Sequence, residues 1–361
     1  MTPGPGLLTW DRPFYWEQWA AEHHATRTGV IAMDMSFMAK FLVQGRDAGR
    51  VLEWVSANTV DGEPGRLTYT QWLNERGTLE ADLTVTKLDD ETFWVVASDT
   101  AHRHALTWLR RHTPADAHAF TTDVTSAYAQ LNVQGPQSRA LLQAVTTVDM
   151  SELPYRGARE IPIGFARVLC VRITYLGELG YELYIPTEQA LHVYERIVAA
   201  GADLGLRHAG LKALASLRME KGYRDYGHDI DNTDSVFEAG LGFAVALEKP
   251  AFLGRDAVLA ARAGGPPRRR LVQVLLTDPE PLLHHGEVVY RDGEEVGYVR
   301  AASYGHTLGG AVGLAMVQAP GPVTAAWLAT GEWSLDVAGV RHGARTSLRP
   351  LYDPSNDRIR A

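Results

Sequence analysis

Arg218 is the residue whose type and position most directly indicate chemistry. It lies in a helix-like stretch, and spacing of three and four residues places it on the same helical face as Leu211, Leu214 and Ala215. A guanidinium on an apolar stripe is unfavourable unless a carboxylate or a ligand pairs with it. The sequence therefore leaves two interpretations open: an internal salt bridge, or a pocket residue that faces a ligand.

Two carboxylates in predicted strands are further candidates. Asp82 lies in the run LEADLTVTKL, where alternation places it with Glu80 and Thr84 on a polar strand face. Glu182 lies in the run YELYIP, on the same strand face as Tyr184. From the residues alone, Asp82 is a strand carboxylate that faces solvent, and Glu182 is an edge-strand glutamate that pairs with a lysine or arginine.

Composition limits the class of protein. A chain of 361 residues is long enough for two or three domains. The hydrophobic content of 45% and the mean hydropathy of -0.16 are typical of soluble proteins. The net charge of -8 argues against nucleic-acid binding. A single cysteine, Cys170, excludes an internal disulfide. Without a signal-peptide pattern or a membrane-length apolar run, we expect a cytoplasmic protein.

Periodicity and turn residues predict the elements that position these side chains. We expect helices over residues 14–28, 47–56, 101–112 and 188–200, and another helix that carries Arg218. We expect strands over 29–36, 39–45, 66–74, 79–88 and 91–98, and a hairpin from 165–176 and 181–186 with its turn at 177–180. After the linker AGGPPRRR at 263–270, short strands at regular spacing predict a small antiparallel barrel.

Several blocks in the same order carry a family resemblance. Residues 216–241 contain the patterns SLR-x-E-KGY, then G-x-D, then EAGL, and TYLGELGYELYIP matches a second block over about a dozen positions. The chain resembles the glycine-cleavage T-proteins, which are aminomethyltransferases. It resembles still more the folate-binding domain that ends dimethylglycine and sarcosine dehydrogenases. The similarity extends from roughly Trp16 to Asp357.

The resemblance implies an α+β fold with three domains around a central folate channel, ending in a small antiparallel β-barrel. The implied folate-binding domain is discontinuous and comprises residues 1–56 and 163–262. An α+β domain that carries the catalytic aspartate spans 57–162, and the barrel domain spans 268–361. Because no G-x-G-x-x-G pattern follows an early strand, we interpret the chain as a standalone folate-binding unit without a flavin domain.

The resemblance also assigns roles to individual residues. Asp82 would be the catalytic carboxylate that orients folate, stabilises a developing iminium cation and relays a proton. Glu182 would accept the amino group and the ring N–H of the pterin as a bidentate pair, and Arg218 would brace that pocket. The other implied folate contacts are Tyr69, Trp94, Val96, Ser98, Tyr175 and Phe243.

The implied activity is tetrahydrofolate-dependent one-carbon transfer by an aminomethyltransferase or demethylase. A methyl or methylene group would pass from a small N-methyl or O-methyl substrate to tetrahydrofolate. The implied partners are a separate flavoprotein or a lipoyl carrier protein, with no nucleic acid, membrane or metal. The alternative is a non-catalytic folate-binding subunit or regulator that partners a separate flavin dehydrogenase. His306 could reach the mouth of the pocket.

Overall fold

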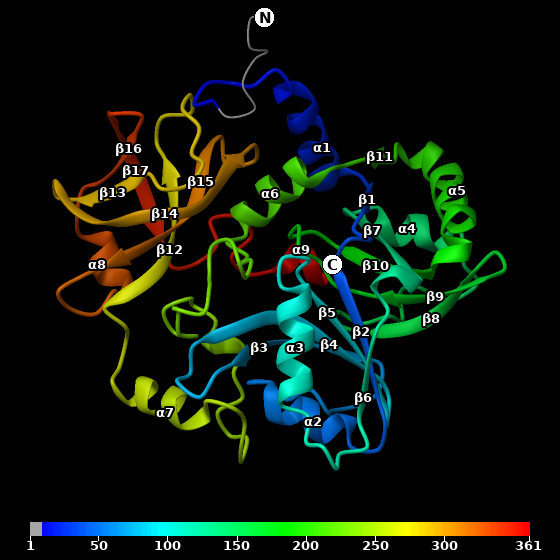
Figure 1. The fold of residues 1–361 in the computed structure, drawn as a ribbon. Coiled ribbons are helices and arrows are strands. Elements are labelled where there is room, and N and C mark those ends of the chain that lie inside the picture. The colour runs from blue at the N-terminus through cyan, green and yellow to red at the C-terminus, as the bar shows by residue number, and fades with distance from the viewer. Residues whose placement is uncertain (1–8) are drawn as a thin grey trace, which may run out of the picture.

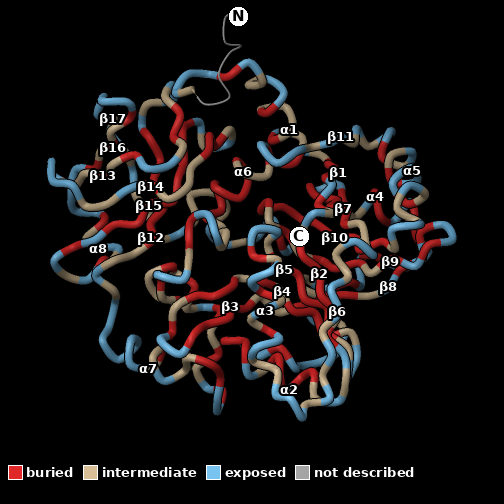
Figure 2. The backbone as a smooth tube through the Cα atoms, in the orientation of Figure 1, coloured by how far each residue is buried: buried red, intermediate tan, exposed pale blue. Residues whose placement is uncertain are grey.

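The chain forms two β-sheets and a closed β-barrel, with helices on their outer faces and between them (Figure 1). The structure is a computed structural model that describes residues 9–361, so the first eight residues of the expected range 1–56 lie outside it. No helix within the described residues is long and apolar enough to cross a membrane. The buried segments are mainly the strands of the two sheets and two barrel strands, Arg269–Leu276 and Gly310–Gln318 (Figure 2).

A six-stranded sheet has the strand order β11-β1-β7-β10-β9-β8. Its strands are β1 (Ile31–Asp34), β7 (Tyr128–Gln134), β8 (Ala158–Ile163), β9 (Ala166–Val171), β10 (Gly180–Pro186) and β11 (Arg207–His208). All neighbours are antiparallel except β1 and β11. The outer face is covered by α4 (Ser138–Gln143) and α5 (Ala190–Gly201). The hairpin predicted from the turn at 177–180 is confirmed as β9 and β10.

A five-stranded antiparallel sheet has the order β3-β4-β5-β2-β6. Its strands are β2 (Ala39–Gln44), β3 (Arg66–Leu73), β4 (Leu79–Asp89), β5 (Thr92–Ala97) and β6 (Phe120–Asp123). Helices α2 (Ala48–Val55) and α3 (His102–Arg111) pack on one face, where they bury apolar side chains against the strands (Figure 1). Every second strand residue points to these helices, so the residues between them face the rest of the molecule.

The free faces of the two sheets meet at one apolar cluster. Trp94 and Val96 of β5 pack there with Tyr184 of β10 and Val171 of β9. On these strands the intervening residues, such as Val95 and Leu183, point to the helix-covered faces. The polar residues Asp82 and Glu182 therefore lie on the inner faces of their sheets, because they share strand faces with residues that turn away from the helices.

The C-terminal part forms the closed barrel that the strand spacing predicts. Its strands are β12 (Arg269–Leu276), β13 (Val288–Arg291), β14 (Glu294–Gly305), β15 (Gly310–Gln318), β16 (Trp333–Val337) and β17 (Val340–Ser347). Helices α1 (Trp16–Thr28) and α6 (Leu211–Glu220) lie between the barrel and the six-stranded sheet (Figure 1). The remaining helices are α7 (Arg255–Ala263), α8 (Ala325–Ala329) and α9 (Asp357–Arg360).

Sheet membership differs from the residue ranges that the resemblance implies. Strand β2, in the expected range 1–56, pairs with β5 and β6. Strands β7 and β8, which lie wholly or almost wholly in the range 57–162, pair with β1, β10 and β9. The reason is that the turn between β1 and β2 sends two neighbouring strands into different sheets, and each sheet is completed by pairing between distant segments. The division into three domains stays a prediction.

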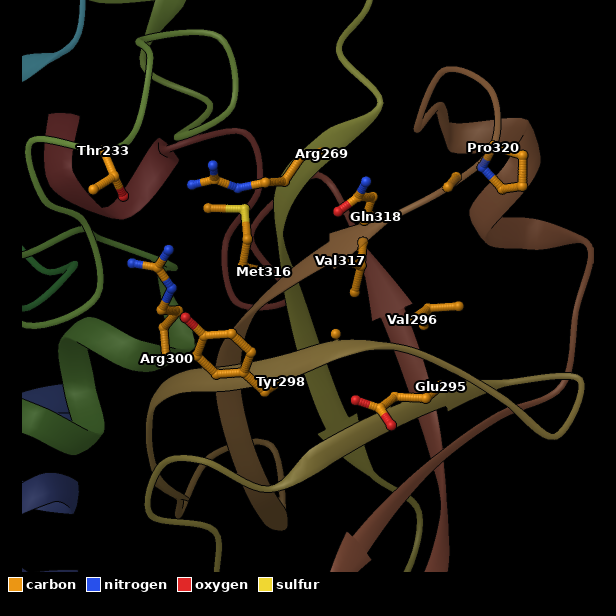
Figure 3. Close-up of a pocket in the computed structure, with 12 residues that line it drawn as sticks. Thr233, Arg269, Glu295, Val296, Tyr298, Arg300, Met316, Val317, Gln318 and Pro320 are labelled. Carbon is orange, nitrogen blue, oxygen red and sulfur yellow. The ribbon is translucent and has the colours of Figure 1, made fainter.

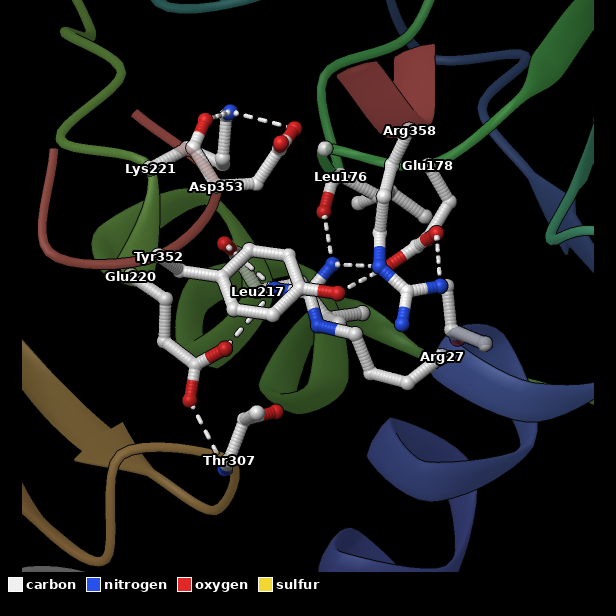
Figure 4. Close-up of polar contacts among 12 residues, drawn as sticks. Arg27, Leu176, Glu178, Leu217, Glu220, Lys221, Thr307, Tyr352, Asp353 and Arg358 are labelled. Carbon is white, nitrogen blue, oxygen red and sulfur yellow. Dashed lines mark hydrogen bonds and ion pairs between the residues drawn. The ribbon is translucent and has the colours of Figure 1, made fainter. Parts of the chain in front are cut away.

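Arg27 lies at the centre of a buried polar network that joins several elements (Figure 4). Its guanidinium donates to Glu220 of α6 at 2.8 Å and to Glu178, in the loop before β10, at 3.2 Å. Glu220 also accepts from the barrel backbone at Thr307 N, at 2.8 Å. Glu178 accepts from the Tyr352 hydroxyl at 2.5 Å. The network therefore ties α1, α6, the six-stranded sheet and the barrel into one unit.

Candidate functional site

The inner face of the five-stranded sheet carries a tyrosine–carboxylate pair. The Tyr69 hydroxyl of β3 donates to Oδ2 of Asp82 on β4. The Tyr69 ring stacks on Phe243, with ring centroids 6.2 Å apart and an interplanar angle of 24°. Phe243 itself is 71% exposed, so an aromatic face beside this carboxylate is open. The strand face is not the solvent-facing one expected from the residues alone, since Asp82 is only partly exposed and Thr86 on the same face is 1% exposed.

The environment of Asp82 favours its protonated form. Burial is the main cause that raises the pKa of Asp82 to about 7, and the negative charges of Asp225 and Asp229 add to it. The hydrogen bond from Tyr69 and the charge of Arg224 act in the opposite direction. A carboxyl group with a pKa near neutrality can both hold and release a proton at physiological pH. Asp82 is therefore suited to general acid–base work.

Arg218 is buried at the C-terminal end of α6 and has a carboxylate partner. Its Nη1 atom donates to Asp229 at 3.2 and 3.3 Å and to the carbonyl oxygen of Tyr223 at 2.9 Å. The internal salt bridge that the sequence left open is therefore present. The expected apolar stripe is wrong at its first position, because Leu211 is 55% exposed where the helix begins.

The loop after α6 supplies charged residues that sequence reasoning missed. Tyr175 donates from its hydroxyl to the carbonyl oxygen of Arg224 at 2.5 Å, and Arg224 Nε donates to Ala239 O at 2.9 Å. Asp225, the next residue, has a side chain that is 25% exposed. The density of charge in KGYRDYGHDID is the sequence signal that could have identified Arg224 and Asp225.

Ser98 contributes to the contact between this loop and the five-stranded sheet. Its hydroxyl lies 3.0 Å from the Thr100 hydroxyl, which donates to the carbonyl oxygen of Tyr226 at 3.3 Å. The end of β5 is therefore fixed next to the loop that carries Asp225. A direct contact between Ser98 and a ligand stays a prediction.

Glu182 lies in the middle of the six-stranded sheet. The edge-strand interpretation is wrong, because β10 is paired on both sides, with β7 and β9. Oε2 of Glu182 accepts from the Tyr184 hydroxyl at 2.5 Å. Within residues 9–361 no lysine or arginine nitrogen lies within 4.0 Å of this carboxylate, so the predicted basic partner is absent there. Burial raises the pKa of Glu182, whereas Tyr184, Asn132 and the charge of Lys40 lower it.

Trp94 and Val96 connect the two carboxylate-bearing strands. Both are almost completely buried, with exposed fractions of 3% and 6%. Across the strands Val96 pairs with Thr84 of β4, while the Trp94 ring contacts the Tyr184 ring edge-on at 5.2 Å. In this structure they support the Tyr184 side chain that bonds Glu182. Direct contact of Trp94 and Val96 with a ligand stays a prediction.

The predicted site residues thus form two connected groups. Asp82, Tyr69, Phe243, Tyr175 and Arg218 lie around the loop that follows α6, and Glu182, Trp94 and Val96 lie where the sheets meet. A folate molecule has a flat ring with N–H donors and needs carboxylate acceptors and aromatic faces. Glu182 without a basic partner within 4.0 Å among the described residues, and the exposed ring of Phe243, fit those needs.

A large open groove lies elsewhere, on the barrel, and holds none of the predicted residues (Figure 3). It has a volume of about 880 Å³ and is lined by Arg269, Arg300 and Tyr298 among others. Both arginines pair with the buried carboxylate of Asp234. Because their charges are already matched, the groove offers no free cation for an anionic ligand among the described residues that line it. The chemistry indicated by the pKa values lies at Asp82 instead.

His306 does not reach the site. Its ring packs edge-on against Trp16 and Trp19 of α1, with centroids 4.9 and 4.8 Å apart. Burial lowers the pKa of His306 to about 3. A neutral histidine between two indole rings is a packing residue at the junction of α1 and the barrel.

Comparison with known proteins gives consistent relatives along the whole chain. Residues 6–249 match the GCVT N-terminal domain, and residues 269–353 match the glycine cleavage T-protein C-terminal barrel domain. An aminomethyltransferase from Geobacillus kaustophilus is 34% identical over 95% of this chain and 93% of that protein. The crystal structure of the glycine cleavage system aminomethyltransferase T from Bartonella henselae has a TM-score of 0.82, with 25% identity over 93% of this chain and 90% of that one.

Other relatives are longer than this chain. A 4-methylaminobutanoate oxidase (formaldehyde-forming) from Paenarthrobacter nicotinovorans is 38% identical over 98% of this chain, but the chain spans only 42% of that protein. The matches to both family domains, the full-length likeness to an aminomethyltransferase and the shared fold lead to one conclusion. The chain belongs to the glycine cleavage T-protein family.

Proposed function

We propose that this protein is a tetrahydrofolate-dependent one-carbon transferase, an aminomethyltransferase or demethylase that acts on a small methylated molecule. The observation that carries the proposal is the Asp82 carboxyl group, whose pKa is raised to about 7 and which is oriented by Tyr69. A protonatable carboxyl beside an open aromatic face is what proton transfer at a bound folate requires. Membership of the T-protein family supports the same reading.

Each residue of the proposed site has a distinct task. Glu182, held by Tyr184, would accept the pterin amino group and ring N–H. Phe243 and Tyr69 would cover the flat part of the ligand, and Arg218, fixed by Asp229, would brace the loop that carries Asp225. When bound, tetrahydrofolate would supply the nucleophilic nitrogen that takes up the one-carbon unit. Asp82 would hold a proton next to that nitrogen and stabilise positive charge that develops there.

The donor is proposed to be a small N-methyl compound, with O-methyl compounds as the less favoured class. The name of the Paenarthrobacter relative, a 4-methylaminobutanoate oxidase, supports an N-methyl donor. Asp225 supports it too, since its partly exposed carboxylate favours a cationic nitrogen. A separate flavoprotein or a lipoyl carrier protein would deliver the one-carbon unit where the donor is not demethylated directly.

A transfer assay tests the proposal. The protein is incubated with tetrahydrofolate and, one at a time, 13C-methyl-labelled sarcosine, dimethylglycine, 4-methylaminobutanoate and a methoxylated aromatic acid. Carbon NMR then follows methyl- and methylene-tetrahydrofolate. 13C-labelled formaldehyde mixed with each demethylated amine serves as a source of the already oxidised one-carbon unit. We expect labelled folate from at least one N-methyl donor or its formaldehyde mixture, above the rate without protein. Folate binding without any labelled product would indicate a non-catalytic folate-binding subunit instead.

A further inference from the structure

Lys40 is a completely buried lysine outside the predicted set of site residues. It lies on β2 with 0% exposure, although lysine is almost never fully buried without a partner. Its Nζ atom donates to the carbonyl oxygens of Ser36 and Met38 at 2.9 and 2.7 Å. These carbonyls belong to the turn between β1 and β2. An ammonium group has three N–H donors, so the two carbonyls do not use all of them.

Carboxylates on three different elements act electrostatically on this ammonium. They are Asp34 at the end of β1, Asp123 at the end of β6 and Glu182 on β10. None of them lies within 4.0 Å of Nζ in the described part of the chain, so they act through space and not as a salt bridge. Asp123 has its own partner in His102 of α3, at 2.7 Å. Asp34 accepts from the backbone of Ser36 at 2.9 Å.

Among the described residues, Asp34 and Glu182 are the carboxylates of this group without a positively charged partner within 4.0 Å, and of these two Asp34 is exposed whereas Glu182 is only partly exposed. The Glu182 carboxylate accepts from the neutral hydroxyl of Tyr184 at 2.5 Å. Asn132 opposes it on β7 and also lowers its pKa. Lys40 therefore supplies the positive charge that acts on Glu182 from the neighbouring sheet.

Two structural connections link Lys40 to Glu182. On β5, Val96 pairs with Lys40 and packs in the same cluster as Tyr184, which bonds Glu182. The turn that Lys40 holds also contacts β7, because Gln130 N donates to Ser36 Oγ at 3.0 Å. The Gln130 side chain in turn donates to Asn132 at 3.2 Å.

We propose that Lys40 is a positioning residue for folate recognition, whose buried ammonium keeps the Glu182 carboxylate ionised so that it can accept both pterin N–H donors. This inference rests on the proposed function, because it assumes that Glu182 binds the pterin. A protonated glutamic acid would present a donor where the ligand also presents donors, and one of the two hydrogen bonds would be lost.

The two pKa values agree with this role. Burial lowers the pKa of Lys40 to about 8, against the opposing effect of Asp123, Asp34 and Glu182, so Lys40 is largely charged at neutral pH. Burial raises the pKa of Glu182, and the charge of Lys40 works against that rise. Removing the Lys40 charge should therefore move the ionisation of Glu182 to higher pH.

Calorimetric titration with tetrahydrofolate as a function of pH tests the proposal. Wild type, Lys40→Met and Lys40→Arg are compared from about pH 6 to about pH 9, where one unit of pKa corresponds to a tenfold change in affinity. We expect Lys40→Met to bind about threefold more weakly at the acidic end, which corresponds to about half a unit of pKa, and to approach wild type at the alkaline end. Lys40→Arg, which keeps the charge, should follow the wild-type profile.

Lys249 provides a matched control. It is also buried, and its Nζ atom donates to the carbonyl oxygens of Glu53, Ser56 and Asn58 at 2.7, 2.9 and 2.9 Å. Glu182 is not among the groups that act on it. Lys249→Met should therefore lower stability without moving the pH profile of folate affinity.

Three outcomes would overturn the role of Lys40. They are an unchanged pH profile in Lys40→Met, a loss of affinity by the same factor at every pH, and failure of both Lys40→Met and Lys40→Gln to fold. Each would leave Lys40 as a structural residue of the turn. The proposed function fails in a different way, since wild type would then show no binding heat at any pH, and the role of Lys40 in folate recognition would fail with it.

Discussion

Asp82→Asn is expected to lower the rate of one-carbon transfer at least about 100-fold, the low end of what a general acid–base group contributes. The affinity for tetrahydrofolate should stay close to that of wild type, because the proposed task of Asp82 lies in the transition state. The wild-type rate should also depend on pH with a midpoint near the Asp82 pKa of about 7. Asp82→Asn should lack this limb. Steady-state rates across pH, with calorimetry for affinity, check both points.

Glu80→Gln is the matched control for Asp82. Glu80 lies two residues away on the same strand, at a bulge in its pairing with β3, and bonds Asn74 at 2.8 Å and His104 of α3 at 2.9 Å. Its substitution should affect stability more than transfer. A fall of less than about fivefold in Asp82→Asn, with the pH limb retained, would contradict the assignment of the catalytic carboxyl group.

Asp82→Asn also has a predictable effect on the stability of the fold. Because the folded-state pKa of Asp82 is raised above its unfolded value, the folded state binds the proton more tightly. The contribution of Asp82 to stability is therefore lost as pH rises from about 4 to about 7. Asp82→Asn should melt at a higher temperature than wild type at about pH 8, and this gain should shrink at about pH 4.

Arg27→Met is expected to lower the free energy of unfolding by about 3–5 kcal/mol, the cost typical of leaving a buried charge without its partner. The reason is that Glu178 and Glu220, with side chains 1% and 0% exposed, would lose the guanidinium between them. Urea unfolding measured by circular dichroism checks the size of the effect. Arg358→Met is the matched control, since Arg358 also pairs with Glu178, at 3.5 Å, but is 49% exposed. It should cost about 1 kcal/mol or less.

The Arg27 network also predicts how the protein responds to acid. Burial alone would raise the pKa of Glu220, but hydrogen bonding to His23 and the charge of Arg27 lower it to about 2. A lowered folded-state pKa gives stability that is present above the ordinary glutamate value and is lost as pH falls towards 2. Arg27→Met should shift acid unfolding to higher pH. Equal stability of Arg27→Met and Arg358→Met would contradict the central place of Arg27.

Local patterns predicted much of the architecture. Turn residues and alternation located the hairpin of β9 and β10 and the C-terminal barrel, because these elements pair with their neighbours in the chain or recur at short spacing. Pairing between distant segments was not predictable in the same way. The turn between β1 and β2 separates them into two sheets, and nothing in the local sequence encodes that each strand meets a partner many residues away.

The site was predictable in its residue types but not in its environment. Alternation placed Asp82 on a polar strand face, yet periodicity alone does not say whether such a face meets water or another sheet. Lys40 was missed for a related reason: an ionisable residue in a strand is normally assigned to the surface, and its burial follows from the packing of the turn between β1 and β2. Asp225 and Arg224 could not be assigned to the site from the sequence, because it is the fold of the loop after α6 that brings their charges near Asp82.

The most direct test of the central claim is calorimetric titration of tetrahydrofolate into wild type, Glu182→Gln and Asp82→Asn. Wild type should bind, and Glu182→Gln should lose about 1.5–3 kcal/mol of binding free energy, as expected for hydrogen bonds to a charged group. Asp82→Asn should bind like wild type. If wild type gives neither binding heat nor a thermal shift with tetrahydrofolate, the inner faces of the two sheets do not form a folate site, and the proposed one-carbon chemistry is wrong.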